Sequence, residues 1–247
     1  MASLPVEFSI SNVFSNTFGV IARNAPLFLG LSLIIVGLPQ LLIGLFVTPE
    51  TTDPTAFISN PGTLFGSIIG SIAFWLLSIV LQASLIVASA NDLAGRPVNF
   101  GECVNRAFGK LLPLIGLGIV VAIGVTFGLL LVIVPGVILY LMWIVAVPAL
   151  MVENIGVFEA LSRSSALTKG SRLKLLGLII VFIVFSIIIA IPFGVLTMIS
   201  TTLSALSSAL ISTASAAVGS AGIAAVYIEL RGTKEGTSSE QLASVFA

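Results

Sequence analysis

The sequence contains no histidine, one cysteine and few charged residues. Histidine is the commonest general base and the commonest metal ligand of proteins, so its absence argues against acid–base and metal-dependent catalysis. The single Cys103 can form neither an intrachain disulfide nor, alone, a zinc site. Phosphate-binding glycine loops, nucleophile elbows and nucleic-acid-binding motifs are also missing. The sequence therefore predicts no enzyme activity, no cofactor and no nucleic-acid partner.

Charged residues make up only 8% of the chain and hydrophobic residues 57%. A soluble domain carries roughly 25% charged residues, so most of this surface must face lipid instead of water. Four stretches lack Asp, Glu, Lys and Arg altogether: residues 24–49, 54–91, 111–152 and 175–228. A helix needs about 20 apolar residues to cross the bilayer core, so the first two stretches hold one span each and the last two hold two each.

We therefore expect an all-α membrane protein with six transmembrane helices in a single integral membrane domain, residues 1–247. The expected spans are residues 26–47, 64–88, 112–133, 136–152, 175–198 and 208–228. Residues 134–136 are expected to join the third and fourth spans as a hairpin, with Pro135 opening the next helix and Gly136 permitting a tight reversal, and the polar residues 200–207 are expected to form another turn. Pro39 is expected to kink the first span, and Pro192 to kink or end the fifth.

The positions of Lys and Arg predict the orientation. With six spans, all ten of these residues fall on one side, which the positive-inside rule assigns to the cytoplasm. Both termini, including a tail at residues 229–247, are then cytoplasmic. Glu50 and Asp53 are the only charges on the opposite side, and we interpret them as a solvated turn, although an ion site is the alternative.

Three segments before spans have one apolar face, which predicts amphipathic helices lying at the cytoplasmic surface. They are residues 9–23 with Ser9 as N-cap, a segment following the cap candidate Asn99, and residues 156–168. Together they suggest three repeats of an interfacial helix plus a helical hairpin. The alternative is that any basic amphipathic linker before a span looks this way. A capping box at residues 237–240 predicts a further short helix in the tail.

No ionisable side chain lies within the expected spans, which argues against a proton-coupled or charged-substrate transporter. Polar side chains that could line a site are Gln40, Gln82, Ser78, Thr126 and Tyr140. Gln40 and Gln82 lie at depths of about 21 and 9 Å from the cytoplasmic ends of their helices, so they should not meet. Hydrogen bonding between helices is the simpler explanation of these residues.

Small residues indicate how the helices pack. Gly66 with Gly70, and Gly124 with Gly128, are pairs one turn apart that allow close helix approach. The last span is rich in Ala, Ser, Thr and Gly, so we expect it at the centre of the bundle; a polar pore lining is the alternative. Cys103 is expected to be a small buried thiol, with acylation as the alternative.

Several motifs in the last 150 residues resemble the glycerophosphoryl diester phosphodiesterase membrane-domain family. They are Val134-Pro135-Gly136, Trp143, Val147-Pro148, Glu153, Phe158-Glu159-Ala160-Leu161, Ser164, Lys169-Gly170, and residues 227–236 and 242–246. The resemblance implies a six-span domain of the bacterial inner membrane. In that family this domain sometimes precedes a phosphodiesterase domain, which we do not expect in this chain. The resemblance supplies no functional residues.

Two functions remain open at this stage. The first is a non-enzymatic membrane scaffold or accessory subunit that organises lipids or protein partners, in the membrane or at its cytoplasmic face. The second is a carrier or channel for a neutral or lipid-like solute, passing along the small-residue last span. The content of the bundle interior distinguishes them, since transport requires a continuous path through it.

Overall fold

The computed structural model describes residues 8–46, 61–197 and 200–236, and throughout these ranges the only regular elements are helices. Residues 47–60, with Glu50 and Asp53, and the residues beyond 236, with the predicted capping box, lie outside the described residues. The helices are α1 (Ile10–Arg23), α2 (Ala25–Ser32), the π-helical η1 (Leu33–Gly37), α3 (Leu38–Phe46), α5 (Pro61–Leu93), α6 (Phe100–Gly109), α7 (Leu111–Leu131), α8 (Ile133–Trp143), α9 (Ala146–Glu153), α10 (Val157–Thr168), α11 (Arg172–Thr197) and α12 (Thr201–Glu235).

Six helical segments are long and apolar enough to cross a membrane, as the sequence predicts. They are Ala25–Leu45, Ile68–Leu93, Leu111–Leu131, Ile133–Glu153, Arg172–Leu196 and Thr201–Glu235. The all-α, six-span fold class is thereby confirmed, and it indicates a multi-pass membrane protein. We call the ends at Ala25, Leu93, Leu111, Glu153, Arg172 and Glu235 the charged ends of the spans, because the basic residues lie on or next to them.

Two predicted turns are placed differently. The hairpin between α7 and α8 turns at the single extended residue Val132, not at residues 134–136. Pro135 is thus in the first turn of α8, where its missing N–H would have no helical partner. Residues 200–207 do not form the predicted turn either, because α12 begins at Thr201. The Ser200 Oγ accepts a hydrogen bond from the Leu203 N–H at 3.1 Å and caps this longer helix.

The two span prolines have different surroundings. Pro39 is the second residue of α3 and follows the π-helical turn η1, which contains residue 35, the position four before it whose carbonyl a proline ring would crowd in an α-helix. The wider π turn accommodates a side chain that an α-helix would exclude. Pro192 lies inside α11, which continues to Thr197, so it does not end the fifth span.

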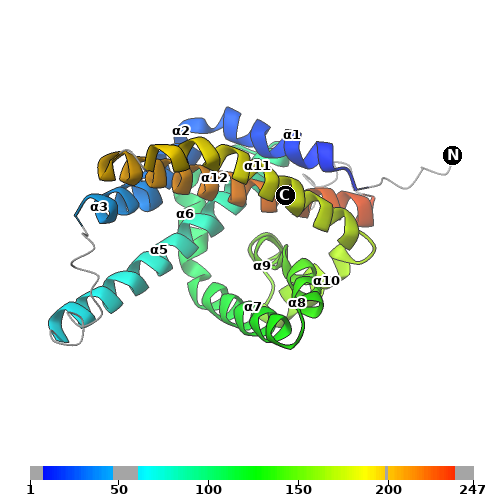
Figure 1. Ribbon diagram of the computed structural model, residues 1–247. Helices are drawn as coiled ribbons and strands as arrows, with labels where there is room; N and C mark the ends of the chain where they lie inside the picture. The colour runs from blue at the N-terminus through cyan, green and yellow to red at the C-terminus, as the bar shows by residue number, and fades with distance from the viewer. Residues whose placement is uncertain (1–7, 47–60, 198–199, 237–247) are drawn as a thin grey trace.

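Helix α12 is the centre of the fold, as its small residues predict. It packs against α1, α2, η1, α3, α5, α9, α10 and α11 (Figure 1). Ala217, Ala221, Ala224 and Ala225 along it are fully buried. Such small side chains let the surrounding backbones approach closely.

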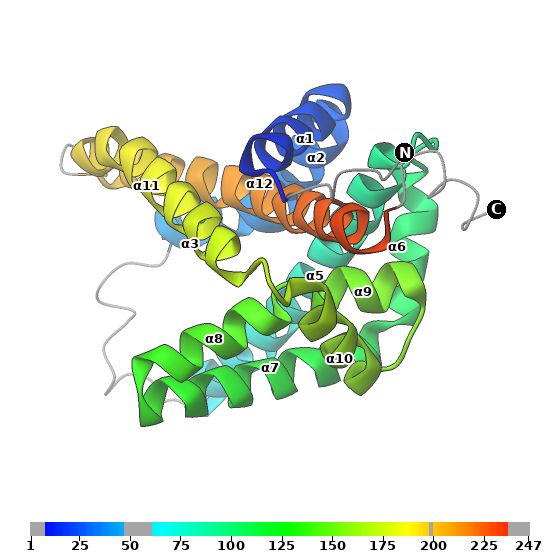
Figure 2. The ribbon, with the colours of Figure 1, turned by 90° about the vertical axis from the view of Figure 1, so that its right-hand side faces the viewer.

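A short helix precedes a pair of spans three times, at α1, α6 and α10. The predicted caps of the first two are confirmed, since the Ser9 Oγ accepts from the Asn12 N–H and the Asn99 Oδ1 accepts from the Glu102 N–H. The three units are not packed alike: α7 and α8 lie side by side (Figure 2), whereas α2–α3 packs mainly on α12 and little on α5. The location of the short helices at a membrane surface stays a prediction.

Candidate functional site: an apolar groove and the charged ends beside it

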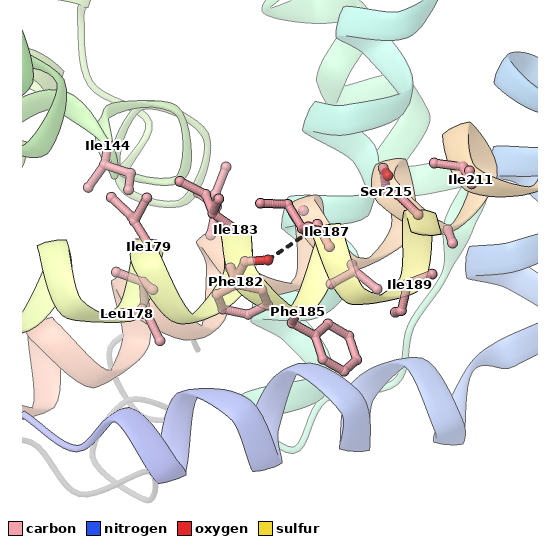
Figure 3. A pocket seen from close by; sticks show the side chains of 18 of the residues that line it. Ile144, Leu178, Ile179, Phe182, Ile183, Phe185, Ile187, Ile189, Ile211 and Ser215 are labelled. Atoms are coloured by element: carbon pink, nitrogen blue, oxygen red, sulfur yellow. Dashed lines mark hydrogen bonds between the residues drawn. The ribbon is translucent and has the colours of Figure 1, made fainter. Parts of the chain in front are cut away.

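An open groove of about 590 Å³ lies between α8, α11 and α12. Its walls are almost entirely aliphatic and aromatic (Figure 3). The lining residues are Tyr140, Ile144, Leu178, Ile179, Phe182, Ile183, Phe185, Ser186, Ile187, Ile189, Ala190, Ile211, Ala214, Ser215, Val218, Gly219, Gly222, Ile223 and Val226. We call it the α11/α12 groove.

The two principal walls have different side chains. On α11, Ile179, Ile183, Ser186 and Ala190 recur at helical spacing and line the groove as one stripe. On α12 four of the eight lining residues are small, namely Ala214, Ser215, Gly219 and Gly222. At Gly219 no described atom lies within 4 Å of the position that a Cβ would occupy. Bulky residues on one helix and small ones on its neighbour therefore open this groove.

The polar groups of the groove are few. The Ser186 hydroxyl donates to the Phe182 carbonyl of its own helix at 2.8 Å (Figure 3), so its proton is already used. Ser215 and Tyr140 are exposed and offer one hydroxyl each. An apolar wall with so few polar groups suits a hydrocarbon chain and provides no continuous polar path.

A second cavity of about 480 Å³ lies on the other side of the same helices. It is lined by residues of α2, η1, α11 and α12, and it shares Ile189, Ile211 and Ala214 with the α11/α12 groove. The two cavities thus flank one stretch where α11 meets α12.

An ionic network joins α9, α10 and α12 at their charged ends. The Arg163 Nε donates to both carboxylate oxygens of Glu153 at 2.9 Å, and the Tyr227 hydroxyl donates to Glu153 Oε1 at 2.8 Å. Arg163 also pairs with Glu235, which in turn accepts from the Arg231 Nε at 2.7 Å. Tyr227 is 0% exposed and Arg231 7%. Arg231 is the buried charge of this network and is tolerated because Glu235 pairs with it, whereas the side chains of Arg163, Glu153 and Glu235 are partly exposed.

The network fits a structural clamp better than a catalytic centre. Glu153 ends α9, and Asn154 follows in the left-handed conformation at φ 57°, which turns the chain toward α10. Burial lowers the pKa of Arg163, but hydrogen bonds to Glu235 and Glu153 outweigh it and raise that pKa, so the guanidinium stays charged. All five groups are engaged with one another, and the clamp fixes α10 and α12 beside the groove.

A smaller polar contact fixes α1 and α2 to α5. The Asn24 Nδ2 donates to Asp92 Oδ1 at 2.8 Å, and the Arg23 Nε donates to Asp92 Oδ2 at 3.1 Å. The hydrogen bond to Asp92 raises the pKa of Arg23. Charged ends of two spans are joined here too.

The polar side chains singled out from the sequence do not converge. Tyr140 alone among the five lines the α11/α12 groove. Gln82 and Thr126 are exposed at separate places on α5 and α7, and Gln40 is half-buried on α3. The Ser78 hydroxyl donates to the Phe74 carbonyl of its own helix. Gln40 and Gln82 line neither described cavity, so an intramembrane polar site formed by the five stays a prediction.

The two predicted glycine pairs have different surroundings. A Cβ on Gly124 would lie 2.5 Å from the Trp143 ring, and one on Gly128 would lie 2.8 Å from the Gly136 Cα, so both permit the close α7–α8 contact. At Gly66 and Gly70 no described atom lies within 4 Å. The close approaches of the first span to α12 occur instead at Gly37 and Gly44, which the sequence analysis missed because they are two turns apart.

Cys103 is 1% exposed. Burial raises the pKa of its thiol, partly opposed by Arg106, so the side chain is an uncharged thiol at neutral pH. Within the described ranges no group of three or more His, Cys, Asp or Glu residues could hold a metal ion.

Comparison of the chain with protein-family models, with curated proteins and with solved structures finds no match.

Proposed function

We propose that this chain is a non-enzymatic membrane protein that binds and organises lipids, and that it acts as a scaffold or accessory subunit. The observation that carries the proposal is the α11/α12 groove. It is open, lies within the membrane-spanning part of two helices, and has almost wholly apolar walls. A lipid acyl chain is the ligand that a bilayer supplies to such a surface at high concentration.

The proposed setting is a bacterial inner membrane, with the charged ends and both termini in the cytoplasm. The supporting observation is the distribution of Lys and Arg, which all fall on one side of the six spans. The resemblance to the glycerophosphoryl diester phosphodiesterase membrane-domain family supports the same setting. A protein partner would bind in the membrane or at the cytoplasmic face.

Transport of a neutral or lipid-like solute is the second candidate, and the groove itself is the observation that favours it. Two buried hydroxyls of α12 favour the scaffold instead. Thr213 donates to the Ala209 carbonyl at 2.7 Å and Ser220 to the Ala216 carbonyl at 2.8 Å, both within the helix. Hydroxyls bonded in this way do not offer their protons to a polar solute in a pore.

Filling the groove tests the proposal. Gly219→Trp places a large side chain in the groove, from a position with open space around it. The control Gly118→Trp places the same side chain on an exposed face of α7, outside both cavities. Each protein is purified in mild detergent, and its co-purifying lipids are counted by mass spectrometry. We expect the wild type and Gly118→Trp to retain lipid and Gly219→Trp to lose most of it.

Equal lipid retention by all three proteins would contradict the proposal. Flux of a labelled lipid across proteoliposomes separates the two candidates, since a scaffold gives no flux above empty vesicles and a carrier does.

A further inference from the structure

Arg172 is the first residue of α11 and lies directly in line with the α11/α12 groove. Ile179, Ile183, Ser186 and Ala190 follow it at spacings of 7, 11, 14 and 18 residues, which repeat one face of a helix, and all four line the groove. The guanidinium therefore stands at the charged end of the wall. Side chains of a helix also point toward its N-terminus, which directs Arg172 away from the apolar part and toward the membrane surface.

The guanidinium of Arg172 has no described partner. Its Nε is buried without a hydrogen bond, and no described carboxylate forms an ion pair with the side chain. Arg23, Arg163 and Arg231, by contrast, each pair with a carboxylate. A buried donor left unpaired is costly, so an oxygen-rich ligand at this position would remove a penalty as well as add a contact.

Further positive charge surrounds Arg172, while the nearby carboxylates are engaged. Lys174 lies one turn before the groove residue Leu178, and the Lys234 Nζ lies 3.6 Å from the Cβ position of Gly170. Glu153 and Glu235 are neutralised by Arg163 and Arg231. The positive end of the α11 dipole adds to the same field.

The groove alone cannot select a lipid. Acyl chains are as apolar inside the groove as in the bilayer, so their transfer yields little hydrophobic free energy, and selectivity must come from the headgroup. The spacing along α11 fits such a headgroup contact. Arg172 lies six residues, or about 9 Å, from Leu178 at the end of the groove, and the headgroup region of one leaflet is about 5–8 Å thick.

We propose that Arg172, assisted by Lys174, binds the phosphate of an anionic glycerophospholipid whose acyl chain lies in the α11/α12 groove. This inference rests on the proposed function and adds the class of lipid and the leaflet it comes from, the one at the charged ends. The chemistry recognised is a phosphate diester with net negative charge, which a guanidinium binds through two parallel hydrogen bonds.

The test uses the full chain in detergent, incubated with vesicles of equal parts phosphatidylglycerol and phosphatidylcholine and then re-isolated. Mass spectrometry gives the amount of each lipid retained. We expect the wild type to retain phosphatidylglycerol about five-fold over phosphatidylcholine for each basic residue engaged. Arg172→Gln should lower this ratio about five-fold, leaving the part due to Lys174, while the total lipid stays similar, and Arg172→Lys should restore much of it.

Arg106→Gln is the matched control, because it removes the same charge from the exposed face of α6, away from the groove. Its ratio should equal that of the wild type. An unchanged ratio in Arg172→Gln, or an equal loss in Arg106→Gln, would overturn the assignment to Arg172. If Gly219→Trp keeps both its lipid and its preference, the groove is not the acyl site and the proposed function fails. Size-exclusion profiles confirm that each variant is folded.

Discussion

At the scale of single residues, Glu153 shows how this fold tolerates charge at the ends of apolar helices. Its carboxylate accepts hydrogen bonds from Arg163 and from the hydroxyl of Tyr227, which is 74 positions away in the chain. The carboxylate is thus paired by a cation and by a neutral donor. Removing one partner of such a group leaves the other uncompensated, and that is the expensive change.

Tyr227→Phe isolates the neutral donor. We expect the free energy of unfolding to fall by about 1.5 kcal/mol, because one oxygen of a charged carboxylate loses a hydrogen bond where water is scarce. Loss of helical circular dichroism in a detergent denaturation series measures it. Tyr140→Phe is the control, since Tyr140 is exposed and its hydroxyl makes no hydrogen bond with a described residue. Equal stability of Tyr227→Phe and the wild type would contradict the role of the hydroxyl.

Sequence reasoning does not single out the residues of this network as a site. Charged residues beside a span are visible in the sequence, and so is a tyrosine near the end of the last span. Their pairing depends on how α9, α10 and α12 meet, which no local pattern encodes. Arg172 is a second example. Helical spacing places it on the same face as Ile179 and Ile183, but the sequence does not show that this face lines a groove, because the groove depends on how α11 packs on α12.

At the scale of elements, the lengths of the charge-free stretches predict the spans well. Prolines, glycines and polar residues predict the ends of the spans less well. Pro135 lies in the first turn of α8, as expected, but the reversal that Gly136 indicates occurs earlier, at Val132. Residues 200–207 are polar enough for a loop, but Ser200 caps them into α12. In both places a residue has two good conformations, and packing decides between them.

Glycines in the spans show a related ambiguity, which a substitution can resolve. A Cβ on Gly37 would lie 2.3 Å from the Thr213 Oγ1, so Gly37→Leu should lower the free energy of unfolding by about 1–3 kcal/mol through overpacking. Gly70→Leu is the matched control, because no described atom lies within 4 Å of its Cβ position. The same detergent denaturation series measures both. A larger loss in Gly70→Leu would show that Gly70 packs against a partner and that the first span is not held by Gly37.

At the scale of the whole molecule, the chain combines six spans, a central small-residue helix and basic residues confined to one set of span ends. Periplasmic and cytoplasmic reporters fused after Pro54, Ala94, Gly170 and Ala247 test this arrangement. We expect activity of the periplasmic reporter at Pro54 alone, and of the cytoplasmic reporter at the other three. A periplasmic signal at Gly170 would place basic residues on both faces and contradict the topology.

The most direct test of the central claim, that lipid occupies the α11/α12 groove, is site-specific photo-crosslinking in intact membranes. A photoreactive amino acid at Ser215, an exposed groove residue, is compared with one at Ser220, which is buried on the same helix. Mass spectrometry of the irradiated protein identifies the adducts. The account predicts phospholipid adducts at Ser215 and few at Ser220. Adducts at Ser215 made only of protein would show that a polypeptide covers the groove, and would contradict the account.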